Sequence, residues 1–349
     1  MAYTAIDDPE AYFQTKLYTG DASTTQAQTL DGTTDMQPDM VWIKQRNGTN
    51  NHMLADAVRG ANNKITPNEN YANDTGTTSL KAFNSDGFSV GSNTEAGGSS
   101  TYVAWCWKAN GSGATNEAGS INTIKTSANT TSGFSISTFT GTGANATIGH
   151  GIGIAPHWVI VKKTSGTQSW SVFHIGNTSA PETENLYLNT TAATSDSDVY
   201  WQDTLPSTTL ITLGSDDDVN ASSATYISYA FAPVQGFSKF GSYTGNGNAD
   251  GTFVYTGFRP AFLIAKRTDS TNSWHMWDNK RDGYNESNED LRANMSAAEG
   301  EGNVAVDLLS NGFKFLSSDG AFNASGTYIY MAFAEAPFVN SNGVPNNAR

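Results

Sequence analysis

One eight-residue pattern of alternating side chains is written three times along the chain. The copies are Thr101–Lys108, Thr225–Ala232 and Thr327–Ala334. Read with a period of two, each copy places large apolar side chains on one face, while the other face opens with a tyrosine and then turns small. The large-face residues are Val103, Trp105, Trp107, Ile227, Tyr229, Phe231, Ile329, Met331 and Phe333. The alternation predicts a β-strand with its bulky side in a core and its small side beneath a close layer.

The segments before these strands also correspond. Identical residues recur 104 positions apart in the second and third copies, as Pro156 and Pro260, Lys162 and Lys266, and Trp170 and Trp274. The first copy is more diverged, although Lys44 matches the same lysine position. A proline-led strand, apolar on both faces, ends at each lysine and is therefore expected to be central in its sheet. With frequent turn signals between short strands, the pattern predicts an all-β fold of three tandem β-sandwich repeats of about 100 residues each.

This periodicity divides the chain into six segments. They are an N-terminal attachment segment at 1–10, a first unit at 11–109, a linker at 110–132, a second unit at 133–234, a third unit at 236–338 and a C-terminal tail at 339–349. Leu291, Met295 and Ala298 have a helical spacing, but the corresponding segment 186–193 is rich in β-formers. We therefore expect both segments to be extended or irregular.

Composition narrows the classes of function. The net charge is −14 and only 15% of residues are charged, which argues against a nucleic-acid surface built from clustered Lys and Arg. The single cysteine excludes an intrachain disulfide framework. The first residues lack the pattern of a signal peptide, and no apolar run reaches membrane-spanning length. We expect a soluble protein that is not secreted by its own signal, with no nucleic-acid partner and no membrane insertion.

Several motifs suggest chemistry, and each has a simpler structural interpretation. Cys106 could be a nucleophile, but the matching positions hold Ala230 and Ala332, which favours a small buried residue. The five histidines have no metal-ligand spacing. The glycine-rich segment 149–153 lacks the strand–loop–helix context of a phosphate loop and is interpreted as a strand entry. Residues 216–218, three aspartates, favour an exposed turn over a calcium site. We predict no catalytic, cofactor-binding or metal-binding residues, and no cofactor.

The tryptophans divide into two groups. Trp170 and Trp274 occupy a repeated strand position, which favours a core role. Trp201 with Asp203, and Trp277 with Asp278, are not repeated. Because a pyranose ring packs against an aromatic face, these two pairs are the candidate glycan contacts.

Longer motifs run along the whole chain. Among them are Ile6–Thr15, Gln37–Lys44, His52–Gly60, Phe83–Phe88, Gly149–Gly153, Phe240–Gly245, Asp250–Pro260, Tyr328–Phe338 and Asn347–Arg349. Together they resemble a family of repeat-containing virion proteins of tailed bacteriophages, found in marine phages and prophages. The resemblance implies concanavalin-like, lectin-type (jelly-roll) β-sandwich units and a structural, tail-fibre or lectin-like role, with no catalytic residues to carry over.

The leading hypothesis is a non-enzymatic virion structural protein on the particle exterior, made in the host cytoplasm. It would serve as a tail fibre or adhesin, or as a head-surface decoration or fibre, and contribute to host attachment. Its expected partners are other virion proteins, further copies of itself and a host surface glycan. The expected oligomer is a trimer, the commonest arrangement for fibres. One alternative is a lectin-like glycan-binding module. The other is a glycan depolymerase, which needs two carboxylates roughly 5 to 10 Å apart in a groove. An exposed aromatic ring beside Asp or Asn would favour the lectin, and a deep acidic cleft the enzyme.

Overall fold

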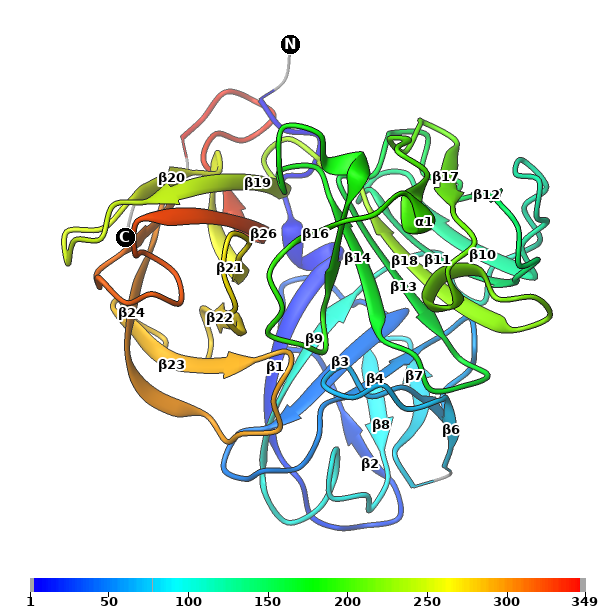
Figure 1. The fold of residues 1–349 in the computed structure, drawn as a ribbon. Coiled ribbons are helices and arrows are strands. Elements are labelled where there is room, and N and C mark those ends of the chain that lie inside the picture. Colours follow the sequence, from blue (N-terminus) through cyan, green and yellow to red (C-terminus); the bar gives the residue numbers. More distant parts are fainter. Residues whose placement is uncertain (1–2, 77, 346–349) are drawn as a thin grey trace.

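Three groups of strands, which we call sectors, make up the fold in a computed structural model that describes residues 3–76 and 78–345 (Figure 1). Sector 1 runs from Phe13 to Trp107, sector 2 from Lys125 to Phe231, and sector 3 from Ser238 to Pro337. The helical elements are one turn each: η1 (Pro9–Ala11), η2 (Pro181–Thr183), α1 (Asp198–Trp201) and α2 (Asp217–Asn220). The predicted all-β class is confirmed.

The strands of each sector follow in chain order. Sector 1 contains β1 (Phe13–Thr19), β2 (Gln26–Gln28), β3 (Met40–Gln45), β4 (Met53–Asp56), β5 (Asn63–Lys64), β6 (Asp74–Thr75), β7 (Leu80–Asn84), β8 (Gly87–Val90) and β9 (Thr101–Trp107). Sector 2 contains β10 (Lys125–Asn129), β11 (Phe134–Thr140), β12 (Ala146–Gly149), β13 (Trp158–Lys163), β14 (Trp170–His174), β15 (Glu184–Tyr187), β16 (Ser195–Asp196), β17 (Leu210–Leu213) and β18 (Thr225–Phe231). Sector 3 contains β19 (Ser238–Gly245), β20 (Phe253–Tyr255), β21 (Phe258–Arg267), β22 (Trp274–Asp278), β23 (Ser287–Arg292), β24 (Gly300–Leu309), β25 (Gly312–Phe315) and β26 (Gly326–Pro337).

The main sheets of the three sectors share one strand order. It is β1-β9-β3-β4 in sector 1, β11-β18-β13-β14 in sector 2 and β19-β26-β21-β22 in sector 3, with antiparallel neighbours throughout. The strands β9, β18 and β26 carry the thrice-written pattern. Each lies between β1, β11 or β19 on one side and the proline-led strand β3, β13 or β21 on the other. The proline-led strands, which the sequence predicts to be central, are likewise internal to their sheets.

A second, smaller layer packs against the small face of each main sheet. The layers are β2-β8-β7, β12-β17 and β20-β25-β24, and the third is continuous with its main sheet through β23. Between the layers lie three separate apolar clusters: small-face residues of β9 meet Phe88, those of β18 meet Ile148, and those of β26 meet Phe313. Two layers around an apolar filling are consistent with a β-sandwich.

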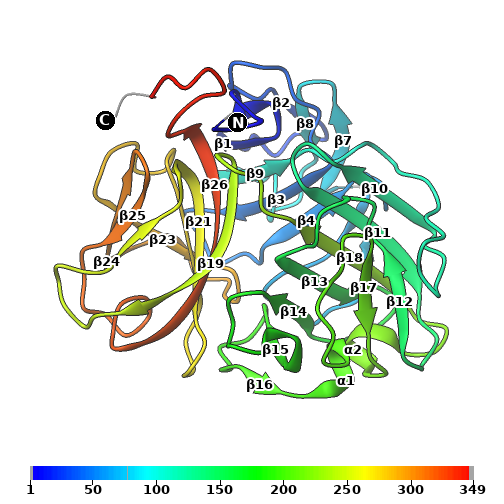
Figure 2. The ribbon, with the colours of Figure 1, turned by 90° about the horizontal axis from the view of Figure 1, so that it is seen from above.

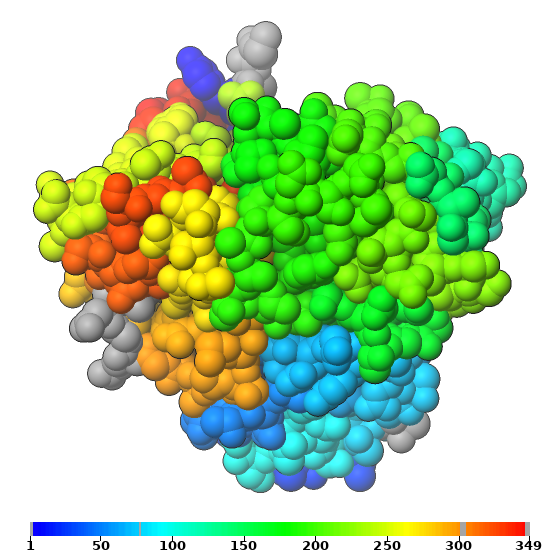
Figure 3. Space-filling view, viewed as in Figure 1, coloured from blue at the N-terminus to red at the C-terminus, as the bar shows by residue number. Residues whose placement is uncertain are grey.

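The large faces of all three main sheets meet in one central core. Trp107, Phe231 and Phe333, the last large-face residues of β9, β18 and β26, form a triangle of rings. Their centroids are separated by 6.4 Å (Trp107 to Phe231), 5.8 Å (Trp107 to Phe333) and 5.9 Å (Phe231 to Phe333). The three sectors, blue to cyan, green and yellow to red, therefore surround one shared centre and close on one another (Figures 2 and 3). A sector on its own would expose its most apolar face to water.

The contacts between sectors form a closed ring. Three backbone amides donate to carbonyls at equivalent positions, two residues after each repeated lysine: Glu299 to Arg46 (2.7 Å), Asn73 to Thr164 (2.9 Å) and Thr194 to Thr268 (2.9 Å). These bonds join sector 3 to sector 1, sector 1 to sector 2 and sector 2 to sector 3. We call the contact regions joint 3–1, joint 1–2 and joint 2–3. Each sector uses one face toward the next and another toward the previous one, as in a head-to-tail ring.

The repeated lysines are buried and hold the hairpins that follow them. The Lys44 ammonium donates to the carbonyls of Gln45 and Gly48 at 2.7 and 3.0 Å, and Lys162 and Lys266 each donate to the carbonyl of the next residue. An ammonium has three donors to satisfy, and the loop carbonyls supply acceptors where water is absent.

Smaller expectations can be compared with the structure. No helix forms at 186–193 or 291–298, as expected, since β15 and β23 end there in turns. Within the segment that the sequence marks as a linker, 110–132, residues 125–129 form β10 and extend the sheet of sector 2. Segment 149–153 begins at Gly149, the last residue of β12. It therefore leads out of a strand, whereas the sequence predicted that it leads into one. In the aspartate run, Asp216 caps α2, Asp217 is exposed and Asp218 is buried.

Candidate functional site

The four candidate glycan contacts do not lie together. Trp201 is 2% exposed and Trp277 is fully buried. They lie in the apolar clusters between the two layers of sectors 2 and 3 respectively, and we call the three clusters of this kind, one in each sector, satellite cores. Asp278 is buried and paired with Arg281. Neither indole therefore presents a free face to a sugar ring. Their non-repetition, which singled them out, reflects differences in packing between sectors.

Asp203 is the one member of that set at the surface. It lines an open groove of about 290 Å³ on sector 2. The described residues around this groove are Asn145, Asp198, Val199, Gln202, Asp203 and Ser215. Two carboxylates thus share a groove without an aromatic ring among its described lining residues.

A larger groove, of about 470 Å³, has exposed aromatic rings in its wall. It is lined by Tyr3, Pro233, Gln235, Gly236, Ser238, Lys239, Tyr255, Thr256, Gly257, Phe338 and Val339. Tyr3 is 57% exposed and Tyr255 is 53% exposed. This volume is in the range that holds small ligands. Comparison of the corresponding segments could not find it, because Tyr3 and Tyr255 lie outside the strands of the main sheets and only Ser238 and Lys239 of the described lining belong to one, β19.

Three segments distant in sequence build this groove. Thr4 Oγ1 donates to the Gln235 carbonyl at 2.9 Å, which joins the N-terminal segment to the connection between sectors 2 and 3. Gly236 has φ +79°, and a Cβ there would lie 2.7 Å from the Thr4 side chain, so only glycine fits. The Phe338 amide donates to the Gly257 carbonyl at 3.1 Å and sets the opposite wall. The expected attachment segment is thus packed into the body, with Thr4 and Ile6 buried; residues 1–2 lie outside the described part.

One cation lies in the groove wall. Lys239 Nζ donates to the Tyr255 carbonyl at 2.7 Å and lies 5.3 Å from the centroid of the Tyr255 ring. Partial burial lowers the pKa of Lys239 below its ordinary value. The described lining residues include no Asp or Glu. The groove therefore offers ring faces, hydroxyl and amide groups and one ammonium, which suits binding, and it lacks the carboxylate pair that glycoside hydrolysis requires.

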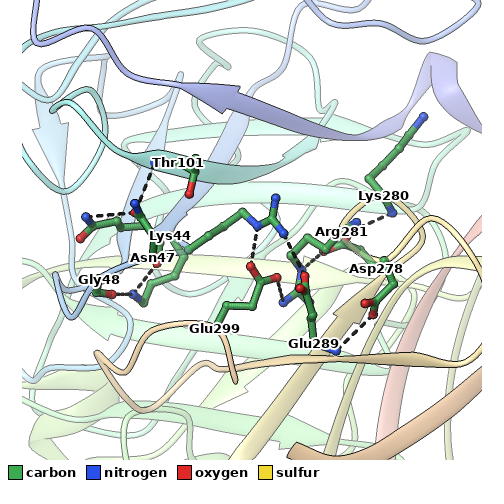
Figure 4. A network of polar contacts seen from close by, with 12 residues as sticks. Lys44, Asn47, Gly48, Thr101, Asp278, Lys280, Arg281, Glu289 and Glu299 are labelled. Atoms are coloured by element: carbon green, nitrogen blue, oxygen red, sulfur yellow. Dashed lines mark hydrogen bonds and ion pairs between the residues drawn. The ribbon is translucent and has the colours of Figure 1, made fainter. Parts of the chain in front are cut away.

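A cluster of carboxylates and guanidinium groups lies at joint 3–1 (Figure 4). Arg46 contacts Glu299 at 2.6 Å and Glu289 at 2.9 Å, and Arg281 contacts Glu299 at 3.2 Å and Asp278 at 2.6 Å. Burial, and then the neighbouring Glu299 carboxyl, raise the pKa of Glu289 to about 7. Arg46 belongs to sector 1, whereas Arg281 and the three acids belong to sector 3. Because Arg46 pairs with two of these acids, the cluster ties sector 1 to sector 3.

The sequence contains a signal for part of this cluster. Asp56 and Arg59 have the same Asp-x-x-Arg spacing as Asp278 and Arg281, and in each pair the aspartate is the last residue of the corresponding strand, β4 or β22. In both places the aspartate accepts a hydrogen bond from the central strand of another sector, from Trp105 Nε1 to Asp278 (3.1 Å) and from the Tyr229 hydroxyl to Asp56 (2.7 Å). The repeated motif marks joints between sectors.

The remaining candidates for chemistry are the Cys106 thiol and a metal site. Cys106 is fully buried in the sector 1 satellite core, and burial raises the pKa of its thiol far above the usual value. The described residues contain no group of three or more His, Cys, Asp or Glu able to hold a metal ion. Within residues 3–76 and 78–345, no helix is long and apolar enough to cross a membrane.

Fold and groove together define an all-β protein of three sectors around a shared core, with an aromatic surface groove suited to ligand binding. The chain belongs to the family described as domain of unknown function (DUF7483), whose profile matches residues 8–337. No curated protein and no solved structure matches the chain.

Proposed function

We propose that this protein is a non-enzymatic structural protein of a tailed-bacteriophage particle, exposed on the exterior, which contributes to host attachment by binding a surface glycan. The resemblance of its motifs to phage virion proteins supports the virion role. The groove between Tyr3 and Tyr255 carries the binding role, since exposed rings beside hydroxyl, amide and ammonium groups suit a sugar. We also propose that each sector is a lectin-type β-sandwich and that the three are tandem repeats, which the common strand order of the main sheets supports.

The binding role is tested by glycan titration. Purified protein is screened against host-envelope polysaccharides, and hits are measured by calorimetry with wild type, Tyr255→Ala and Tyr3→Ala. Each truncation should weaken binding at least about 5-fold, because a ring-stacking contact contributes about 1 kcal/mol beyond its buried area. Tyr284→Ala is the matched control, since Tyr284 is 84% exposed and does not line the groove. Equal affinity in wild type and both groove variants would remove the groove from the proposal.

The particle location is a separate test. Antibody labelling of intact particles distinguishes a tail position, as expected for a fibre or adhesin, from a head-surface position, as expected for a decoration protein. Absence of label from particles that carry all their other structural proteins would refute the virion role.

Self-association remains part of the proposal, because several weak glycan sites presented together bind more strongly than one. Each chain already closes a ring of three sectors, so a homo-oligomer would join complete rings. Light scattering of the purified protein gives the number of chains, and a monomer at micromolar concentration would refute this part.

Attachment through 1–10 is tested with Ala5→Arg, since Ala5 is exposed, whereas deletion would also remove buried Ile6 from the central core.

The depolymerase alternative has one specific observation in its favour, the two carboxylates of the Asp198–Asp203 groove. We expect wild-type protein to release no reducing ends from any polysaccharide that it binds. Release that stops in Asp198→Asn or Asp203→Asn would overturn the non-enzymatic assignment.

A further inference from the structure

A neutral histidine holds joint 2–3. His174 ends β14 at the register position that Asp56 and Asp278 occupy in β4 and β22. Its Nε2 bonds the Tyr330 carbonyl of sector 3 at 3.1 Å, and its Nδ1 accepts the Gly176 amide at 2.9 Å. A carbonyl can only accept and an amide N–H can only donate, so the ring must be the neutral Nε2–H tautomer. A proton added at Nδ1 would face an N–H donor.

Joint 3–1 contains a second histidine in the same bonding state. His52 Nδ1 accepts the Trp42 indole N–H at 2.9 Å, and its Nε2 bonds the carbonyls of Arg292 and Met295 in sector 3, both at 3.1 Å. This ring is fully buried. Protonation would again place an N–H against an N–H donor inside a joint.

Joint 1–2 is built differently. Trp170 occupies the position that His52 has at joint 3–1, and its Nε1 donates to the Glu69 carbonyl at 2.9 Å. Asp56 occupies the position that His174 has at joint 2–3, and it is paired with Arg59. Among the described residues, the histidines that bond across a joint are thus both at the joints of sector 3.

The charged surroundings offer no compensation for an added proton. Lys44 and Arg281 face His52, and His157 faces His174, so the nearby titratable groups that act on these rings are cationic when charged. Burial is the main cause that lowers the pKa of both His52 and His174, to about 3. At joint 3–1, acid also protonates Glu289, which removes part of the attraction to Arg46.

We propose that His52 and His174 form an acid-sensitive latch, which on protonation releases sector 3 from both neighbours while sectors 1 and 2 stay joined. The opened form exposes the face of β26 that carries Phe333. Release is a hinge motion about the short connection between β18 and β19, because sectors 2 and 3 remain covalently linked there.

Three equivalent amides report on the three joints. The amide of Thr194 reports on joint 2–3, that of Glu299 on joint 3–1 and that of Asn73 on joint 1–2, where each donates across its joint. Hydrogen exchange, read by mass spectrometry with fragmentation, is measured between pH 7 and pH 4 and expressed as protection factors. A histidine that titrates normally in the open state and near pH 3 in the closed one contributes about 100-fold by pH 4.5. Because one opening frees both histidines, the Thr194 and Glu299 protection factors should fall on the order of 10,000-fold. Asn73 should keep its protection.

Variants identify the latch residues. The His52→Gln/His174→Gln double variant cannot gain the protons and should keep Thr194 and Glu299 protected at pH 4.5. His150→Gln is the matched control: its Nδ1 accepts the Ile152 amide and its Nε2 bonds the Ser207 carbonyl, all within sector 2, so it should behave as wild type. Equal loss of protection at all three amides in wild type would overturn the proposal, even if the double variant fails to fold. Acid release in a folded double variant at the wild-type pH would also overturn it.

Discussion

The rings of Phe231 and Phe333 lie 5.9 Å apart, although 102 positions separate these residues in the chain. They occupy the same position in β18 and β26, and Trp107 of β9 contacts both. The bulky face of each thrice-written strand is therefore buried against the bulky faces of the other two. The core that the alternation predicts is common to three sectors.

Truncation at this centre should destabilise the whole protein. We expect Phe333→Ala and Phe231→Ala each to lower the free energy of unfolding by about 3–5 kcal/mol, because a buried ring is replaced by a cavity. Denaturant titration followed by circular dichroism measures the change. Cys106→Ala, in the satellite core of sector 1, is the control and should cost much less, since one sulfur is removed. Comparable losses in all three variants would contradict a special role for the centre.

The ion pair at joint 3–1 should matter more than an exposed one. Asp278→Ala leaves Arg281, whose side chain is 1% exposed, without its closest carboxylate, and we expect a loss of about 3–5 kcal/mol in unfolding free energy. Asp250→Asn removes the exposed partner of Lys314 and should change the midpoint of unfolding little. If both variants unfold at the wild-type denaturant concentration, the network does not hold the sectors together.

The buried lysines should make the protein more stable at alkaline pH. Burial lowers the pKa of Lys44, Lys162 and Lys266 to about 8, below the ordinary value of 10.5. Between these values the unfolded chain holds protons that the folded chain has lost, so the free energy of unfolding rises with pH from about 8 to 10. Each lysine adds at most about 1.4 kcal/mol per pH unit. Denaturant titrations at pH 8, 9 and 10 should show a shallower rise in Lys266→Met than in wild type; identical slopes would contradict the titration of Lys266.

The single thiol should be inert until the protein unfolds. Cys106 is fully buried and burial strongly raises the pKa of its thiol, so little thiolate forms and no reagent reaches it. A chromogenic disulfide reagent at pH 8 should leave the native protein largely unlabelled over an hour and should label all of it in denaturant. Rapid reaction of the native protein would show that sector 1 opens.

The candidate glycan contacts illustrate why the role of an aromatic residue is hard to assign from sequence alone. Trp201 and Trp277 lack counterparts in the other sectors, and lack of a counterpart does not distinguish a binding residue from one that fills a cavity particular to its sector. Tyr3 and Tyr255, which do line a groove, lie in segments with little periodic pattern. Their exposure depends on how the N-terminal segment meets the connection between sectors 2 and 3.

The sequence by itself determined the all-β class, the three central strands with their two faces, and the burial of Cys106, Phe231 and Phe333. These follow from alternation with a period of two, which is a local property and recurs in all three central strands. Tertiary structure alone decided that the three large faces share one core, that His52 and His174 lie in joints, and that Glu289 and Glu299 meet Arg46. Those outcomes depend on the relative placement of segments 100 to 250 residues apart, where burial of the most apolar faces selects the arrangement and no local pattern records it.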